Sequence, residues 1–289
     1  MRSHRSGFTL VELSVVLVII GLLVGGILVG RDLIKAAEIR AVVSQGEQIK
    51  AAIAAFKGKF NCLPGDCGNA SDFGFVMGPV YAGQQTGDSL NNTVNGNGDG
   101  VIGDPTGYLF DADRSTYVSE QHMFFWQLVQ ANMLSGTVCM SGQLPVPTCS
   151  PYGPFGFPAK IRLCAWQPGY SAGGPAVPPP PPGVIALGNV ILLAGPNTAC
   201  GFSTCGGAIF SEGVTPEEAK NIDGKVDDGM PNTGQVRAVA SSNYIDATPL
   251  HDDVAHPNRC VDTYSKSALY ASPATDYNTR CNLLFSLGV

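Results

Sequence analysis

The sequence predicts an α+β protein in which a long N-terminal α-helix leads into a globular part of short strands and extended loops. An almost wholly apolar run from Phe8 to Gly30 continues into an amphipathic stretch, as expected for one long helix. Beyond Cys62, short strand-like runs alternate with loops, and the chain contains 36 glycines and 21 prolines. Nine cysteines in 289 residues indicate that disulfides brace those loops.

The apolar run has the sequence FTLVELSVVLVIIGLLVGGILVG. As an α-helix it would be about 35 Å long, which exceeds the roughly 30 Å hydrocarbon core of a bilayer. Arg2 and Arg5 precede it, which favours a cytoplasmic N-terminus. A secretory signal peptide would have a shorter apolar core followed by a small-residue cleavage site, and this run has neither. The run therefore predicts a retained membrane-spanning helix.

One ionisable residue, Glu12, lies inside the apolar run. A carboxylate at that depth is costly unless it finds a partner, so its presence indicates a function. The run also contains glycines at four-residue spacing, namely Gly21, Gly25, Gly26 and Gly30. Such spacing allows close helix packing in lipid, although glycine is also simply common in membrane helices.

The residues Gly7-Phe8-Thr9-Leu10-Val11-Glu12 closely resemble the processing site of type IV prepilins and type II secretion pseudopilins. The resemblance implies that a prepilin peptidase cuts between Gly7 and Phe8 and methylates the new amino group of Phe8. It also implies that Glu12 pairs with the N-terminal amino group of a neighbouring subunit. Pairing these two charges relieves the desolvation penalty of both.

The resemblance divides the chain into four parts. They are a leader peptide (1–7), a transmembrane and filament-core helix (8–30), its amphipathic continuation (31–60) and a globular pilin domain (61–289). Apolar residues recur at three- and four-residue spacing in the continuation, at Leu33, Ala37, Ala41, Ile49, Ala52, Ile53, Phe56 and Phe60. We expect one helix from about Thr9 to Lys57, ended by Gly58 and Pro64. Its second half should pack on the antiparallel sheet of a pilin-like fold.

Further elements are predicted from local patterns. Strands are expected at 160–166, 189–194, 207–211, 235–240 and 282–287. Helices are expected at 120–134 and 216–228, and the second begins with a capping box at Thr215 and Glu218. Asp227 and Asp228 oppose the dipole at the C-terminal end of that helix. They indicate either a partner cation or basic residue, or an exposed and frayed end, and the frayed end is favoured.

The cysteines indicate disulfides formed outside the cytoplasm, because a reducing compartment seldom leaves so many in a chain without a C-x-x-C motif. Cysteines that are close in sequence give four candidate pairs: Cys62 with Cys67, Cys139 with Cys149, Cys200 with Cys205, and Cys260 with Cys281. Cys164 is left over. Either it is a buried thiol or the pairing differs, since eight cysteines allow many connectivities.

The segment from Asn95 to Ile102 resembles the first part of a calcium-binding loop. Oxygen-bearing side chains at alternate positions offer Asn95, Asn97 and Asp99 as ligands, with the carbonyl of Val101 as a fourth. Thr106 stands where such loops have a bidentate glutamate. The candidates to replace that glutamate are Asp104, Asp111, Asp113 and Glu120. An ordinary solvated turn is the alternative, because Asn, Gly and Asp are common turn residues.

Together these features predict a structural subunit, a minor pilin or pseudopilin, of a type IV pilus or a type II secretion system. The chain would sit first in the inner membrane with its bulk in the periplasm, and later in a periplasmic pseudopilus or a surface pilus. Expected partners are the prepilin peptidase, other pilin subunits through the N-terminal helix, and the inner-membrane assembly machinery. The candidate calcium ion is the one expected cofactor.

One alternative is an adhesin- or DNA-uptake-type pilin whose globular domain binds a ligand, and another is a prepilin-like anchor that never polymerises. A formal net charge of −6 and the lack of any cluster of four basic residues argue against a nucleic-acid-binding face. No catalytic motif is recognisable in the sequence, so an enzyme is not expected.

Overall fold

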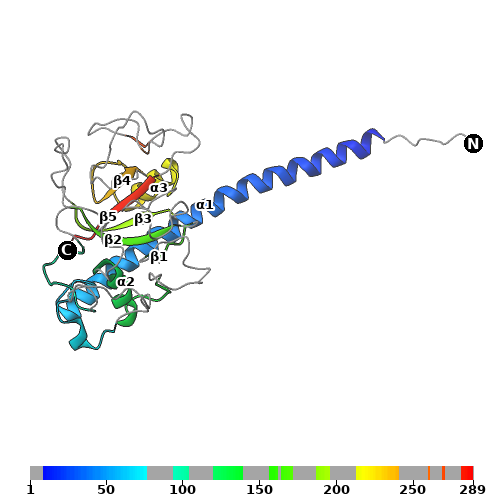
Figure 1. Ribbon diagram of the computed structural model, residues 1–289. Helices are drawn as coiled ribbons and strands as arrows, with labels where there is room; N and C mark the ends of the chain where they lie inside the picture. Colours follow the sequence, from blue (N-terminus) through cyan, green and yellow to red (C-terminus); the bar gives the residue numbers. More distant parts are fainter. Residues whose placement is uncertain are drawn as a thin grey trace, which may run out of the picture.

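The computed structural model of the chain describes residues 9–76, 94–103, 120–138, 156–161, 164–171, 187–195, 213–240, 260, 269–270 and 281–288. A single 51-residue helix, α1 (Leu10–Phe60), projects from a globular part, passes beside a five-stranded antiparallel sheet and ends beyond it near α2 (Figure 1). The predicted α+β architecture, with a long N-terminal helix packed on an antiparallel sheet, is confirmed.

The helix α1 begins at Leu10, with Thr9 as its N-terminal cap, and extends beyond the predicted end at Lys57. Its C-terminal cap is Asn61, whose φ of 58° and ψ of 29° place it in the left-handed region, and the Asn61 N–H donates to the Lys57 carbonyl. Gly58 lies within the last turn and does not end the helix. Asparagine tolerates the left-handed conformation, so Asn61 provides the cap that the sequence analysis assigned to glycine.

The buried face of α1 is confined to its C-terminal part. Buried positions follow three- and four-residue steps, at Ile39, Val42, Gln45, Gly46, Ile49, Ala52, Ile53 and Phe56. Leu33, which was expected on this stripe, is 66% exposed. The stripe therefore begins near Ile39, later than predicted.

The sheet has the strand order β1-β2-β3-β5-β4, and all of its pairings are antiparallel. Its strands are β1 (Phe157–Pro158), β2 (Ala165–Ser171), β3 (Gly188–Ala194), β4 (Val236–Ala240) and β5 (Cys281–Ser286). The predicted strands at 189–194, 235–240 and 282–287 agree with β3, β4 and β5 to within one residue. The predicted strand at 207–211 lies outside the described residues.

The strand predicted at 160–166 is placed wrongly, because β2 begins only at Ala165. Pro168 and Gly169 lie inside β2, opposite Ile191 and Val190 of β3, and both residues normally mark strand ends. Only Ala165 and Trp166 of β2 pair with β1, so Pro168 lies on an effective sheet edge, where its missing N–H donor costs little.

Two shorter helices complete the described fold: α2 (Glu120–Gln130) and α3 (Pro216–Val226). A 3₁₀ turn, η1 (Ala70–Phe73), follows α1. The predicted helices ended at 134 and 228, a few residues too late. The expected capping box of α3 is present, with Thr215 and Glu218 each bonding to the backbone of the other. The helix α3 packs against α1, β4 and β5.

A buried glutamine attaches α1 to the sheet. The Gln45 Oε1 atom accepts hydrogen bonds from the backbone N–H of Lys160 (2.8 Å) and the indole Nε1–H of Trp166 (2.9 Å). The Gln45 Nε2 atom donates to the carbonyl of Pro158 at 2.9 Å. Next to it, Gly46 lets the Trp166 ring lie directly on the helix backbone. These contacts fix both the position and the rotation of α1 on the first two strands.

Two of the four predicted disulfides are present in the described residues: Cys62 is joined to Cys67, and Cys260 to Cys281. The first closes a short loop at the end of α1, and the second attaches position 260 to the first residue of β5.

The other two predicted pairs are not confirmed by the structure. The pair of Cys139 with Cys149 and the pair of Cys200 with Cys205 both lie outside the described residues, so these two pairings stay predictions. The leftover cysteine of the sequence analysis, Cys164, is buried immediately before β2.

Candidate assembly segment and two carboxylate clusters

The predicted processing site lies at the very start of the chain. Gly7 and Phe8 are outside the described residues, and the structure begins at Thr9. Thr9 and Glu12 form a capping box, in which the Glu12 carboxylate accepts from the Thr9 backbone N–H and from the Thr9 hydroxyl, both at 2.8 Å. The Glu12 N–H donates in turn to the Thr9 hydroxyl at 3.3 Å. Within the single chain, the Glu12 carboxylate is thus held at the N-terminus of α1.

The first part of α1 is apolar on all sides and is not covered by the rest of the described chain (Figure 1). Its most exposed large side chains are Leu10, Val11, Leu17 and Leu22. An added Cβ at Gly21, Gly25, Gly26 or Gly30 would meet no atom within 4 Å. By length and composition α1 could cross a membrane, and it is the one described helix of which this is true. We call residues 10–30 the assembly segment.

The residues of the predicted calcium loop do not all make contacts with the same part of the structure. Asn95 bonds to Ser71 of η1 through both amide atoms, accepting from its N–H at 2.8 Å and donating to its hydroxyl at 3.3 Å. Asn97 and Asp99 bond to each other, with Asn97 Nδ2 donating to Asp99 Oδ2 at 2.9 Å. The Val101 N–H donates to Asp99 Oδ1 at 2.8 Å. Asn95 is therefore directed to η1, whereas Asn97 and Asp99 remain together.

Two further carboxylates lie against the same loop. Glu120, the first residue of α2, accepts from the N–H groups of Asn97 (2.9 Å) and Gly103 (3.0 Å). Asp66, from the disulfide loop after α1, accepts from the Gly100 N–H at 3.0 Å. Of the four residues considered as replacements for the missing glutamate, Glu120 thus lies at the loop, and the other three fall outside the described residues. We call Asp66, Asp99 and Glu120 the first carboxylate cluster.

The environment of this cluster disfavours negative charge. Burial raises the pKa of Glu120 to about 7. The hydrogen bonds from the N–H groups of Gly103 and Asn97 act in the opposite direction and lower this pKa. Burial likewise raises the pKa of Asp66, with the nearby charge of Asp99 acting in the same direction. Asp66 is not among the ligands expected from the sequence. Its place between two disulfide-bonded cysteines, beside Gly65, is the signal that could have identified it.

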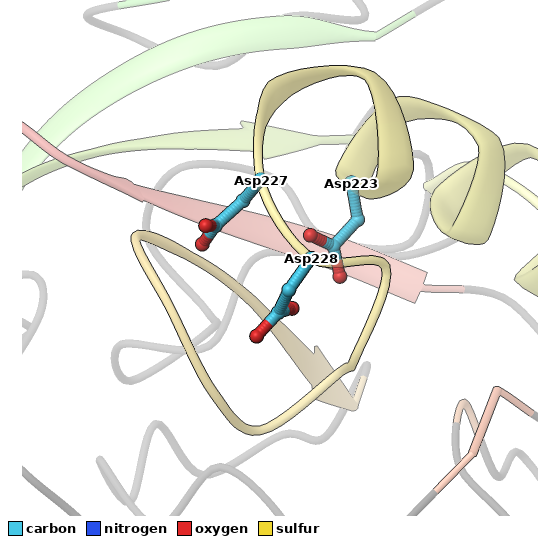
Figure 2. A group of neighbouring side chains, drawn as sticks. All are labelled: Asp223, Asp227 and Asp228. Carbon is cyan, nitrogen blue, oxygen red and sulfur yellow. The ribbon is translucent and has the colours of Figure 1, made fainter.

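A second carboxylate cluster lies at the end of α3 and consists of Asp223, Asp227 and Asp228 (Figure 2). One oxygen from each lies within 4.8 Å of the others. Asp223 accepts from the Tyr270 hydroxyl at 2.8 Å and from the Gly229 N–H at 3.3 Å. Burial raises the pKa of Asp223 to about 7, and the Tyr270 and Gly229 bonds lower it.

The aspartates after α3 shape the loop that leads to β4. Asp227 accepts from the backbone N–H groups of Gln235 and Val236, and Asp228 accepts from the Met230 N–H and the Thr233 hydroxyl. The expectation of a frayed helix end at Asp227 and Asp228 is therefore wrong. The i, i+4 spacing of Asp223 and Asp227 is the sequence signal for this cluster.

The charge of the second cluster is partly balanced within the chain. Burial lowers the pKa of Arg237 in β4, and the nearby negative charges of Asp227 and Asp228 act in the opposite direction. The structure thus provides this cluster with a cationic neighbour and with several hydrogen-bond donors. Such an arrangement is typical of carboxylates that accept hydrogen bonds and thereby stabilise a loop.

Residues 2–28 match the family described as the prokaryotic N-terminal methylation motif. No curated protein and no solved structure matched the chain in these comparisons. The matched residues span the predicted processing site, Glu12 and most of the assembly segment. The N-terminal segment of this chain is therefore that of a type IV pilin-like prepilin, a kind of protein that a prepilin peptidase processes and that assembles with other pilins.

Proposed function

We propose that the chain is a minor pilin or pseudopilin, a structural subunit of a type IV pilus or a type II secretion system. One observation carries the proposal: the methylation motif at 2–28 continues directly into an apolar helix whose exposed surface finds no partner within the described chain. An all-round apolar helix needs lipid or other helices around it. A membrane before assembly and a bundle of the N-terminal helices of other pilin subunits afterwards meet that need in turn.

Processing gives each part of the chain a role. The peptidase removes residues 1–7, residues 8–30 anchor the chain and then build the filament core, residues 31–60 join that helix to the globule, and residues 61–289 form the outer domain. The length of 289 residues and the loop-rich globular part favour a minor or tip subunit over a small abundant one. The inner-membrane assembly machinery would drive the transition from membrane to filament.

In this proposal, Glu12 aligns each subunit with its neighbour along the filament axis. Once Phe8 is the first residue, its amino group is a cation at nearly the same depth as the carboxylate of Glu12 on a neighbouring chain. A charge pair in a low-dielectric core is favourable mainly because each partner alone would be costly there. Removing Glu12 should therefore leave insertion possible but make ordered assembly unfavourable.

Glu12→Ala tests the proposal, with Ser14→Ala as the matched control. Ser14 is also polar and lies in the same segment, but its hydroxyl bonds only to the Val11 carbonyl of its own helix. We expect Glu12→Ala to enter the membrane at wild-type levels and to be at least tenfold depleted from purified filaments, whereas Ser14→Ala assembles normally.

Mass spectrometry of purified filaments checks the processing step. The proposal requires a chain that begins at N-methylated Phe8, present in small amounts if the protein is a minor subunit. An intact Met1 terminus in a host with an active prepilin peptidase would contradict it. So would wild-type filament content of the Glu12→Ala variant.

A further inference from the structure

Three separate segments of the chain meet just beyond the end of α1. The disulfide loop provides Cys67 and Asp66, whose carbonyls accept from the N–H groups of Gly96 and Gly98, both at 2.9 Å. The Gly65 N–H donates to the side chain of Gln127 in α2 at 2.7 Å. An added Cβ at Gly65 would overlap the backbone of Glu120. These contacts hold the loop 94–103, the disulfide loop and the start of α2 close together.

Each of the three segments brings one carboxylate to this junction. They are Asp66 from the disulfide loop, Asp99 from the loop 94–103 and Glu120 from α2. In the described part of the chain, the charged groups that act on Asp66 and Glu120 are carboxylates, with no lysine or arginine among them. This contrasts with the second carboxylate cluster, where Arg237 is close.

One oxygen atom at the junction lacks a partner. Asp66 is only 3% exposed, and its Oδ1 atom has no hydrogen-bond partner in the described structure, whereas its Oδ2 atom is bound to the Gly100 N–H. Leaving a buried polar atom unsatisfied is destabilising, and more so when the group is charged. A bound cation would satisfy the Oδ1 atom and offset the mutual repulsion of the three carboxylates.

We propose that Asp66, Asp99 and Glu120 bind one Ca²⁺ ion at this junction. Carboxylate oxygens are hard ligands that suit Ca²⁺ or Mg²⁺, and an irregular set of groups on loops suits the flexible coordination of Ca²⁺ better than the strict octahedron of Mg²⁺. The Asn97 amide oxygen, which accepts one N–H and keeps a second lone pair, completes the side-chain ligands. Compared with the loop expected from sequence, Asp66 and Glu120 take the places of Asn95 and the absent position-twelve glutamate.

Binding of Ca²⁺ must bring the three carboxylates of the first cluster closer together. Among the described residues, only the second carboxylate cluster has oxygens from three acidic residues within 4.8 Å of one another. The ion therefore has to bring Asp99 and Glu120 inward toward Asp66, and we expect the backbone amides of 97–103 to exchange their hydrogens at least tenfold more slowly with Ca²⁺ present.

Calorimetric titration of the full chain in detergent micelles with CaCl₂, after removal of metal by a chelator, tests the proposal. We expect one Ca²⁺ per chain with a dissociation constant at or below about 1 mM, the weak end of known extracellular sites. We expect Asp66→Asn and Glu120→Gln each to weaken binding at least tenfold. Asp72→Asn, an exposed carboxylate nearby on η1, and Asp228→Asn in the second cluster should bind as the wild type does.

Thermal unfolding separates a cation ligand from a merely structural residue. Asn at position 66 keeps an acceptor for the Gly100 N–H and removes a buried negative charge, so the metal-free melting temperature of Asp66→Asn should equal or exceed that of the wild type. Only the wild type and the controls should gain stability when Ca²⁺ is added. No heat and no melting shift at about 10 mM CaCl₂ would overturn the proposal. Loss of binding in Asp228→Asn with retention in Asp66→Asn would do so as well.

Discussion

The two parts of α1 share one continuous helix but differ in what surrounds them. The assembly segment is apolar on every side, and nothing else in the described chain covers it. The part from Ile39 to Phe56 is apolar on one face only, and that face is buried against α3, α2 and Trp166 of β2. A one-sided apolar pattern is thus satisfied within the chain, whereas an all-round pattern requires partners from outside. Substitutions in the two parts should therefore affect different measurements.

The largest difference should appear on truncating large side chains. Phe56 is fully buried, with ring centroids 4.6 Å from Phe60 and 5.6 Å from Phe75, so Phe56→Ala should lower the free energy of unfolding by about 3–5 kcal/mol. Leu17→Ala in the assembly segment, where the side chain is 69% exposed, should leave it unchanged. Urea denaturation of the full chain in micelles measures both. Equal losses of unfolding free energy in Phe56→Ala and Leu17→Ala would contradict the difference between the two parts of α1.

A smaller loss of unfolding free energy is expected when the polar contact between α1 and the sheet is removed. Gln45→Leu leaves the Trp166 indole N–H and the Lys160 N–H without their shared acceptor, which should cost about 1–3 kcal/mol. Gln48→Leu is the matched control, because Gln48 is exposed one turn away and bonds only to Ser44. The same denaturation experiment should find less than about 0.5 kcal/mol for this control. A comparable loss there would mean that Gln45 acts through helix propensity.

The effect of pH should be confined to the globular part. Burial raises the pKa of Asp223 from its ordinary value of 3.8 to about 7, so between these values the folded chain holds a proton that the unfolded chain releases. The stability from this group is complete below about pH 4 and is lost as pH rises through about 7. Relative to Asp223→Asn, the wild type should lose about 1–2 kcal/mol between pH 5 and pH 8.

Unfolding measured by urea at both pH values tests this difference. Groups remote from Asp223 contribute equally to the two proteins and cancel in the comparison, whereas Asp227 and Asp228 interact with its charge and belong to the measured difference. Parallel pH dependences of the wild type and Asp223→Asn would show that the folded state does not hold the proton.

The smallest effects concern two glycines in the second part of α1. Gly58 is exposed, with no atom within 4 Å of an added Cβ, so Gly58→Ala should raise the free energy of unfolding by about 0.5–1 kcal/mol through helix propensity. At Gly46 an added Cβ would lie 3.3 Å from the Trp166 ring, which Gln45 holds in place. Gly46→Ala should therefore lower the free energy of unfolding slightly and not raise it. Equal gains at both sites would show that the Trp166 ring shifts freely.

Local patterns in the sequence predicted the elements that carry their own signals. The apolar and amphipathic periods of α1, the capping box at Thr215 and the apolar runs of β3 and β5 depend only on neighbouring residues, and the structure contains all of them. The end of α1 was misplaced because Asn61 and Gly58 are both plausible caps, and packing beyond the helix selects between them.

The carboxylate clusters could not be derived in the same way. Asp66 and Glu120 are separated by more than fifty positions, and only the folded chain brings them to one loop. Strand β2 was hidden because Pro168 and Gly169 weaken its pattern, and its place at a sheet edge is a property of the tertiary structure. Long-range pairing of this kind has no counterpart in local composition.

The unbroken course of α1 has a mechanical consequence. Fifty-one residues of helix measure about 77 Å, and no loop interrupts them between the assembly segment and the sheet. A pull or a twist applied at the assembly segment would therefore reach the globular part without loss at a hinge. It would enter the fold along the buried face from Ile39 to Phe56, which includes the Gln45–Trp166 contact. Force applied in the membrane or the filament core would therefore pass to the globular part through the C-terminal half of α1.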